Sequence, residues 1–89
     1  MEQLEFQAEL LAAAIAHAKE FAHGPRQRKD VALFFLRCEL QSLVKQRLYP
    51  EALYARNLIA MCVRSMTLQS LLETFLAALE GNKAAGPTL

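Results

Sequence analysis

Glycine is scarce in this sequence, and the three glycines stand apart at positions 24, 81 and 86. A phosphate-binding loop needs several glycines close together so that the backbone can approach the phosphate. The chain also offers no Ser/His/Asp constellation and no pair of carboxylates that we can place as an acid and a base. These absences argue against an enzyme, and we expect no catalytic residues, no cofactor and no small-molecule substrate.

Long apolar runs, a basic start and alternating patterns are also missing. No stretch of about 18 apolar residues is free of charge, so the sequence predicts no transmembrane helix. The first residues, MEQLEFQAE, are acidic, whereas an export signal begins with basic residues. No segment alternates between apolar and polar residues with a period of two, so no β-strand is predicted. We therefore expect an all-α protein that works in the cytoplasm.

Cysteine and histidine give little sign of metal or redox chemistry. Cys38 and Cys62 each lie within an apolar helical pattern, and we expect both to be buried, reduced thiols. His17, Glu20 and His23 follow one another in steps of three, which makes them spiral around a helix. We therefore predict no metal site at these residues.

Apolar side chains, in contrast, are abundant and make up 54% of the 89 residues. Globular domains typically contain about 45–50%, even when glycine is counted. A single domain of this size buries only a modest fraction of its surface. We therefore expect a protein partner to cover the excess, first of all a second copy of the chain.

Apolar residues recur every three or four positions along most of the chain, which predicts helices. Gly and Pro interrupt this pattern, and one Thr offers an N-cap. The breaks are Gly24-Pro25, Tyr49-Pro50, Thr67 and Gly81-Asn82, and the predicted helices are Glu2–Ala22, Asp30–Tyr49, Pro50–Met66 and Leu68–Glu80. The second helix could begin a turn earlier, and the third and fourth could be continuous. The fold predicted is a small up-and-down bundle of three to four antiparallel helices over residues 1–82, with a disordered tail over 83–89.

The segment Asp30–Tyr49 is apolar on more than one side. Leu33 and Leu36 lie on one stripe, whereas Phe34 and Cys38 point nearly the opposite way. A helix that is apolar all round is usually surrounded by others. We therefore predict that this helix is central and that the other helices pack around it.

Five large side chains are the hardest to cover within one bundle. Phe6, Leu10 and Phe21 form a second stripe on the first predicted helix, and Phe34 and Phe35 lie on the outer side of the second. We predict that these residues form the interface with a partner. The function favoured by this pattern is a small regulator, adaptor or chaperone-like subunit that acts by packing its helices against another protein.

Charge is unevenly distributed although the net charge is only +1. Residues 1–25 carry four Glu and one Lys, whereas residues 26–64 carry eight Arg and Lys against three acidic residues. Arg26, Arg28 and Lys29 form the densest cluster, which we place in a connecting loop. They are candidate anion contacts, and the alternative function is therefore an anion-binding or nucleic-acid-binding regulator. A solvated loop without a ligand is the third interpretation.

Residues 43–53 resemble the turn of a tetratricopeptide repeat, in which Tyr-x-x-Ala opens the second helix. Tyr49 and Ala52 match this pattern. Arg47 stands where the family usually has glycine, and Arg56 stands where it has an aromatic residue. The resemblance covers one helical hairpin, and it implies peptide or protein binding.

Overall fold

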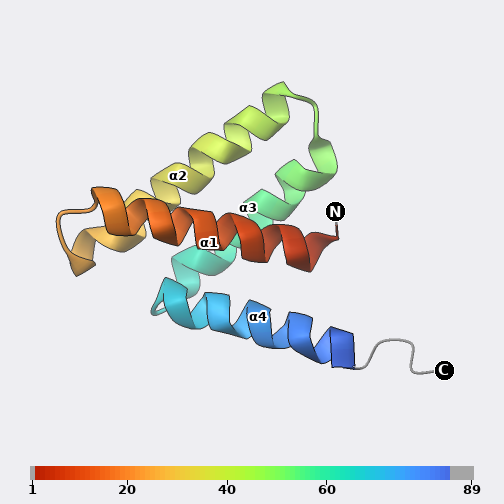
Figure 1. Cartoon of the computed structure of the whole chain (residues 1–89). Helices are drawn as coiled ribbons and strands as arrows, with labels where there is room; N and C mark the ends of the chain where they lie inside the picture. The colour runs from red at the N-terminus through yellow and green to blue at the C-terminus, as the bar shows by residue number, and fades with distance from the viewer. Residues whose placement is uncertain (1, 85–89) are drawn as a thin grey trace.

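The computed structural model describes residues 2–84, and every regular element in that range is an α-helix. The four helices are α1 (Gln3–Phe21), α2 (Pro25–Lys45), α3 (Tyr49–Arg64) and α4 (Leu68–Ala84) (Figure 1). Residues 2–84 contain no strand, so the predicted all-α class is confirmed, and four helices are present where three to four were predicted.

Helix α1 is the centre of the molecule, because it packs against α2, α3 and α4. Helices α2 and α3 form a hairpin that α1 crosses, and α4 lies along α1 in the opposite direction (Figure 1). Helices α3 and α4 hardly touch, although they follow one another in the sequence. The prediction that the second helix is central is therefore wrong.

Side-chain size explains why α1 takes the central position. Ala8, Ala14 and Ala18 are buried on α1, and such small side chains let neighbouring helices approach closely. Helix α2 instead carries Phe34 on its outer side, where the ring is 67% exposed. An apolar pattern counts alanine and phenylalanine alike, but only the small residue admits neighbours on several sides.

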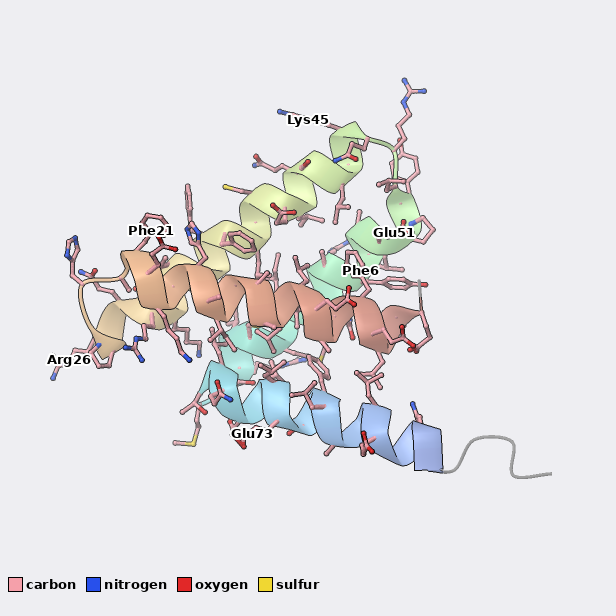
Figure 2. All side chains as sticks on the ribbon, in the orientation of Figure 1. Phe6, Phe21, Arg26, Lys45, Glu51 and Glu73 are labelled. Carbon is pink, nitrogen blue, oxygen red and sulfur yellow. The ribbon has the colours of Figure 1, made fainter. Side chains whose placement is uncertain are left out.

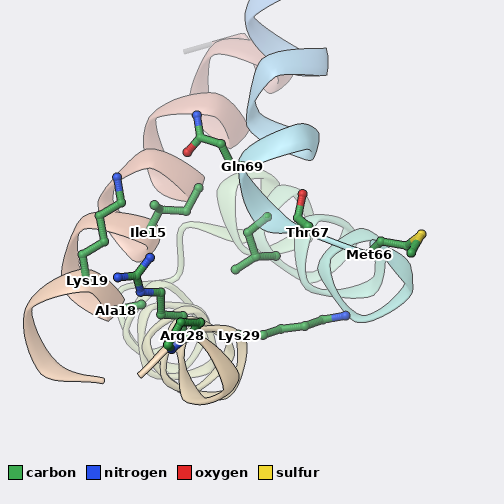
Figure 3. Close-up of a pocket in the computed structure, with 10 residues that line it drawn as sticks. Ile15, Ala18, Lys19, Arg28, Lys29, Met66, Thr67 and Gln69 are labelled. Carbon is green, nitrogen blue, oxygen red and sulfur yellow. The ribbon is translucent and has the colours of Figure 1, made fainter. Parts of the chain in front are cut away.

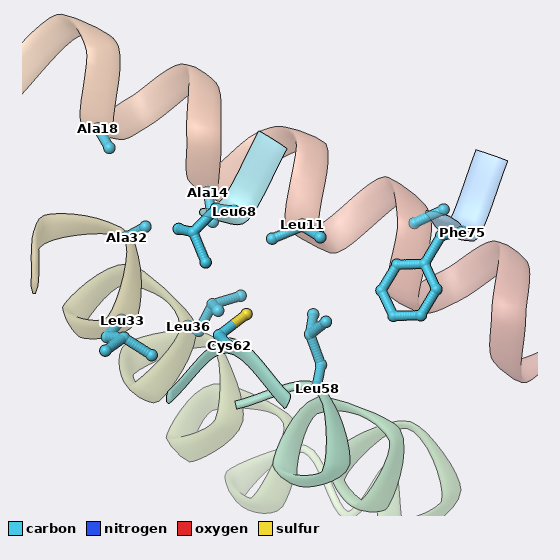
Figure 4. Packing of buried hydrophobic residues seen from close by; sticks show 11 residues of the cluster. Leu11, Ala14, Ala18, Ala32, Leu33, Leu36, Leu58, Cys62, Leu68 and Phe75 are labelled. Carbon is cyan, nitrogen blue, oxygen red and sulfur yellow. The ribbon is translucent and has the colours of Figure 1, made fainter. Parts of the chain in front are cut away.

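The core lies where α1 meets the other three helices (Figure 4). Its largest fully buried side chains are Leu11 of α1, Leu36 of α2, and Leu58 and Cys62 of α3. Helix α4 contributes Phe75, which is 7% exposed. Burial of a side chain of this size stabilises the fold by about 1.5–3 kcal/mol.

One polar residue belongs to this interior. Gln7 is 3% exposed, and its Nε2 donates a hydrogen bond of 3.0 Å to the backbone carbonyl of Tyr54. The bond ties α1 to α3 and satisfies a buried amide that would otherwise destabilise the fold. The apolar pattern gave no reason to place Gln7 inside.

Helix α2 begins at Pro25, five residues before the predicted N-cap Asp30. Proline suits this position, because its fixed φ is helical and the N–H that it lacks would have no partner there. The alternative of an earlier start is therefore confirmed, and the N-cap at Asp30 is wrong. Arg26, Arg28 and Lys29 consequently lie in the first turns of a helix and not in a loop.

Helix α2 ends four residues before its predicted end, in a Schellman motif. The Leu48 N–H donates to the Leu43 carbonyl at 3.0 Å, and the Arg47 N–H donates to the Val44 carbonyl at 3.0 Å. Arg47 has φ 60°, in the left-handed region that glycine prefers. This is the position at which the resembling repeat family usually has glycine.

Helices α3 and α4 are separate, with residues 65–67 between them. The Ser70 N–H donates to the Thr67 Oγ1 at 3.1 Å, so the predicted N-cap is confirmed. The predicted end at Glu80 is wrong, because α4 continues through Gly81 to Ala84. A lone glycine weakens a helix by only about 1 kcal/mol. Residues 85–89 of the predicted disordered tail lie outside the described residues.

Candidate functional site

One side of α1 carries large side chains in two pairs, each pair one helical turn apart, with only alanine at the turn between the pairs. We call it the aromatic face, and it consists of Phe6, Leu10, His17 and Phe21 of α1 together with Phe35 of α2. The ring centroid of His17 lies 4.6 Å from that of Phe21 and 4.9 Å from that of Phe35. The face is therefore continuous from α1 onto α2. Phe6 and Phe21 lie at its two ends (Figure 2).

The aromatic face is only partly covered by the chain itself. Phe21 is 58% exposed, and Phe6, Leu10 and Phe35 are half-buried. At the Phe6 end, the ring of Tyr54 on α3 lies 6.0 Å away, which extends the face toward the hairpin. The structure thus brings together four of the five predicted interface residues, and it adds His17.

Phe34, the fifth predicted interface residue, lies beside the aromatic face. It precedes Phe35 by one residue, which places it about 100° away around α2, and it points outward. Cys38 lies one turn further along the same outer side and is exposed. The prediction that Cys38 is buried is therefore wrong, because the outer side of α2 has no helix over it among the described residues. Cys62 is buried, as predicted.

The thiol of Cys62 lies in the core next to α2. Burial raises the pKa of this thiol to about 11, and the nearby positive charge of Lys29 lowers it by a smaller amount. A buried thiol with a high pKa has almost no thiolate at neutral pH and is a poor nucleophile. Cys62 is therefore a packing residue and not a reactive one.

Lys29 has a defined structural role. Its Nζ donates to the backbone carbonyl of Val63 at 3.1 Å and to that of Ser65 at 2.6 Å. Both carbonyls belong to the C-terminal end of α3, where such groups lack helical partners. An ammonium group at this end also suits the negative pole of the helix dipole. Two of its three N–H donors are therefore engaged within the chain.

The first turn of α2 has an unusual distribution of charge. It contains no acidic residue, Gly24 provides no side-chain cap, and Arg26 and Arg28 lie there instead. Cations are unfavourable at the positive end of a helix dipole, where acidic residues are preferred. The result is a concentration of positive charge at one end of α2.

A cleft lies between the second half of α1, the start of α2 and the turn that joins α3 to α4 (Figure 3). Its volume is about 260 Å³. It is lined by Ile15, Ala18 and Lys19 of α1, Pro25, Arg28 and Lys29 of α2, and Met66, Thr67, Leu68 and Gln69 of the turn and α4. We call it the basic cleft, because three of its ten lining residues are cationic and none is acidic.

The structure divides the three predicted anion contacts. Arg28 and Lys29 line the basic cleft, whereas Arg26 lines a separate shallow hollow with His23 and Gly24. Lys19 joins the cleft from α1. Lys19 could not be expected at this site from the sequence, because it lies ten residues from Lys29 in a helix whose other charged residues are acidic.

Within residues 2–84, no group of three or more His, Cys, Asp and Glu side chains is arranged to bind a metal. His17 packs between two phenylalanine rings instead. No helix in the same range has the length and apolar character needed to cross a membrane. Comparison with protein families, curated proteins and solved structures finds no match to the chain. The functional assignment therefore rests on the geometry of the two surfaces.

Proposed function

We propose that this protein is a non-enzymatic protein–protein interaction module that binds its partner through the aromatic face. The observation that carries the proposal is the set of large, partly exposed side chains that lies on one side of α1 from Phe6 to Phe21 and reaches α2 at Phe35. These residues span about 22 Å along α1 at 1.5 Å per residue. Exposed apolar surface of this extent, with polar residues around it, is typical of interaction sites. Its role would be that of a small regulator, adaptor or chaperone-like subunit.

The partner that fits best is a second copy of the chain, and dimerisation would complete the helical bundle. Glu9 and Glu20 are exposed acidic residues of α1, and Lys45 is an exposed basic residue of α2. In a two-fold dimer each patch meets its own counterpart, so acidic side chains of α1 in one copy can meet basic side chains of α2 in the other. Such complementary charges fix the register of an apolar interface.

The two cysteines support a reducing compartment such as the cytoplasm. Cys38 and Cys62 are both free, and Cys38 is exposed. An exposed thiol stays reduced in the cytosol, whereas it is prone to oxidation outside the cell.

The test is the mass of the purified protein in solution, measured by light scattering over a range of protein and salt concentrations. We expect twice the 10.0 kDa of one chain. Phe21→Ala should weaken the dimer by about 30-fold or more, because two copies of the ring leave the interface at about 1–1.5 kcal/mol each. The fold should persist, since Phe21 is 58% exposed.

Leu76→Ala is the matched control, because Leu76 is 50% exposed on α4, away from the aromatic face. It should leave the dimer unchanged. A monomer at every protein concentration would contradict the proposal, as would an equal loss of dimer in the two variants.

Anion binding at the start of α2 is the second candidate function. It is supported by Arg26 and Arg28 in a first turn that has no acidic residue. These few cations are too few for a nucleic-acid interface. Each phosphate contact contributes about one unit to the slope of log binding constant against log salt concentration, and nucleic-acid binders commonly make about 6–10 such contacts. A small anionic group fits this arrangement better.

A further inference from the structure

We propose that the basic cleft binds a short segment of a partner protein in which an apolar side chain stands beside a carboxylate. The cleft shares no residue with the aromatic face. The proposal therefore does not depend on dimerisation, and each surface can be tested alone.

The size of the cleft favours a side chain over a small-molecule ligand. Its volume of about 260 Å³ lies below the range of about 300–1,000 Å³ that is usual for such ligands. Ile15, Ala18 and Leu68 provide apolar walls, and Leu68 and Ala18 are themselves anchored in the core. A space of this kind suits one large apolar side chain and the backbone around it.

The mouth of the cleft includes Met66, which is 97% exposed. Methionine is flexible and polarisable, and it adapts to the shape of an apolar group placed against it. Met66 lies on the turn between α3 and α4, and Lys29 holds the carbonyl of the preceding residue, Ser65. The turn that forms this wall is therefore fixed, while the methionine side chain itself is free to move.

The positive charge of the cleft favours an anionic ligand. In Figure 3 the Arg28 side chain points toward α1 and Lys19, whereas Lys29 extends the other way toward the end of α3. Arg28 and Lys19 are thus the cations available to a ligand, and an arginine can bind a carboxylate through two parallel hydrogen bonds. Leu68 and Gln69 also line the cleft, and at the start of α4 their backbone N–H groups have no helical partners.

The position of Arg28 is itself an argument for a ligand. A cation in the first turns of α2 opposes the helix dipole, so the residue weakens the helix on which it stands. Local rules of this kind are typically broken where function requires it. A bound carboxylate would offset the unfavourable charge.

The experiment is an NMR titration of the ¹⁵N-labelled full chain with short capped peptides. The probe is acetyl-Gly-Asp-Leu-Glu-Gly-amide. One comparison peptide replaces the acids by Asn and Gln, and another replaces Leu by Ala. We expect the amide signals of Ile15, Leu68 and Gln69 to shift with the probe, and each comparison peptide to bind at least about tenfold more weakly.

The double variant Lys19→Gln/Arg28→Gln should bind the probe at least about tenfold more weakly than the original protein. Its melting temperature should be nearly unchanged, because losing Arg28 from the start of α2 favours that helix while losing Lys19 from the last turn of α1 weakens that one by a similar amount. This second readout distinguishes a binding role from a structural one, for which the melting temperature would fall. The matched control is Arg37→Gln/Arg56→Gln, which removes two exposed cations that do not line the cleft.

Three results would overturn the proposal. The first is equal binding of the acidic and amide peptides. The second is unchanged binding by the Lys19→Gln/Arg28→Gln variant. The third is tighter binding of decanoate or inorganic phosphate than of the probe, which would assign the cleft to a free amphiphile or a simple anion.

Discussion

Arg47 has a side chain that is poorly suited to the backbone conformation at its position. Its left-handed φ of 60° closes the Schellman motif at the end of α2. A residue with a Cβ is destabilised there by about 1–2 kcal/mol relative to the right-handed region. Glycine escapes this cost, although it loses about 0.5–1 kcal/mol more in backbone entropy.

Arg47→Gly should therefore raise the free energy of unfolding by about 0.5–1 kcal/mol, measured by urea denaturation. The control is Arg56→Gly, at an exposed position inside α3 with ordinary helical geometry. There glycine should lower the free energy of unfolding by about 1 kcal/mol. If both variants lose stability alike, the left-handed geometry at Arg47 carries no strain.

The two cysteines should differ in reactivity, since one is exposed and the other is enclosed in the core. With the pKa of Cys62 raised to about 11, about 0.1% of that thiol is ionised at pH 8. In the native protein we expect Ellman's reagent to titrate one thiol, and in guanidinium chloride two. Cys38→Ser should abolish the fast reaction. Rapid labelling of Cys62 in that variant would show that the core opens readily.

Contacts between elements depend on a few polar bonds as well as on apolar burial. Lys29 joins α2 to the end of α3 through two carbonyls, and Gln7 joins α1 to the middle of α3. Neither residue belongs to an apolar stripe, so periodicity could not reveal either contact. All three bonds connect residues more than 30 positions apart in the sequence.

Lys29→Met should lower the free energy of unfolding by about 1–3 kcal/mol, because the carbonyls of Val63 and Ser65 lose a charged donor. Lys45→Met is the control, since Lys45 is exposed in the last turn of α2, and it should change stability by less than about 0.5 kcal/mol. Thermal and urea denaturation provide the measurement. An effect of Lys29→Met no larger than that of the control would mean that water replaces the ammonium without loss.

Across the whole molecule, the sequence predicted the elements better than their arrangement. Proline and Thr67 marked where the helices divide, because caps act within a few residues. The position of α1 could not be read in the same way, since it depends on how closely side chains such as Ala14 let other helices approach. The arrangement of the helices decides which large residues stay exposed. Phe21 and Phe34 could be proposed as exposed only because the sequence contains more large apolar side chains than one small core can bury.

The candidate site was predictable to a similar degree. The aromatic face could be expected from spacing on one helix, as with Phe6 and Leu10. The basic cleft could not, because it unites Lys19, Arg28 and Leu68 from three separate helices. A cleft of this kind arises only when distant segments meet.

The packing of α4 on α1 also has a consequence for synthesis on the ribosome. Helix α1 is made first, yet one of its sides is covered by the helix that is made last among the four. Translation at about 5–20 residues per second leaves that side bare for several seconds. During that interval a chaperone or another protein can bind the uncovered side of α1. Once α4 has been made and packs against α1, that side is no longer accessible.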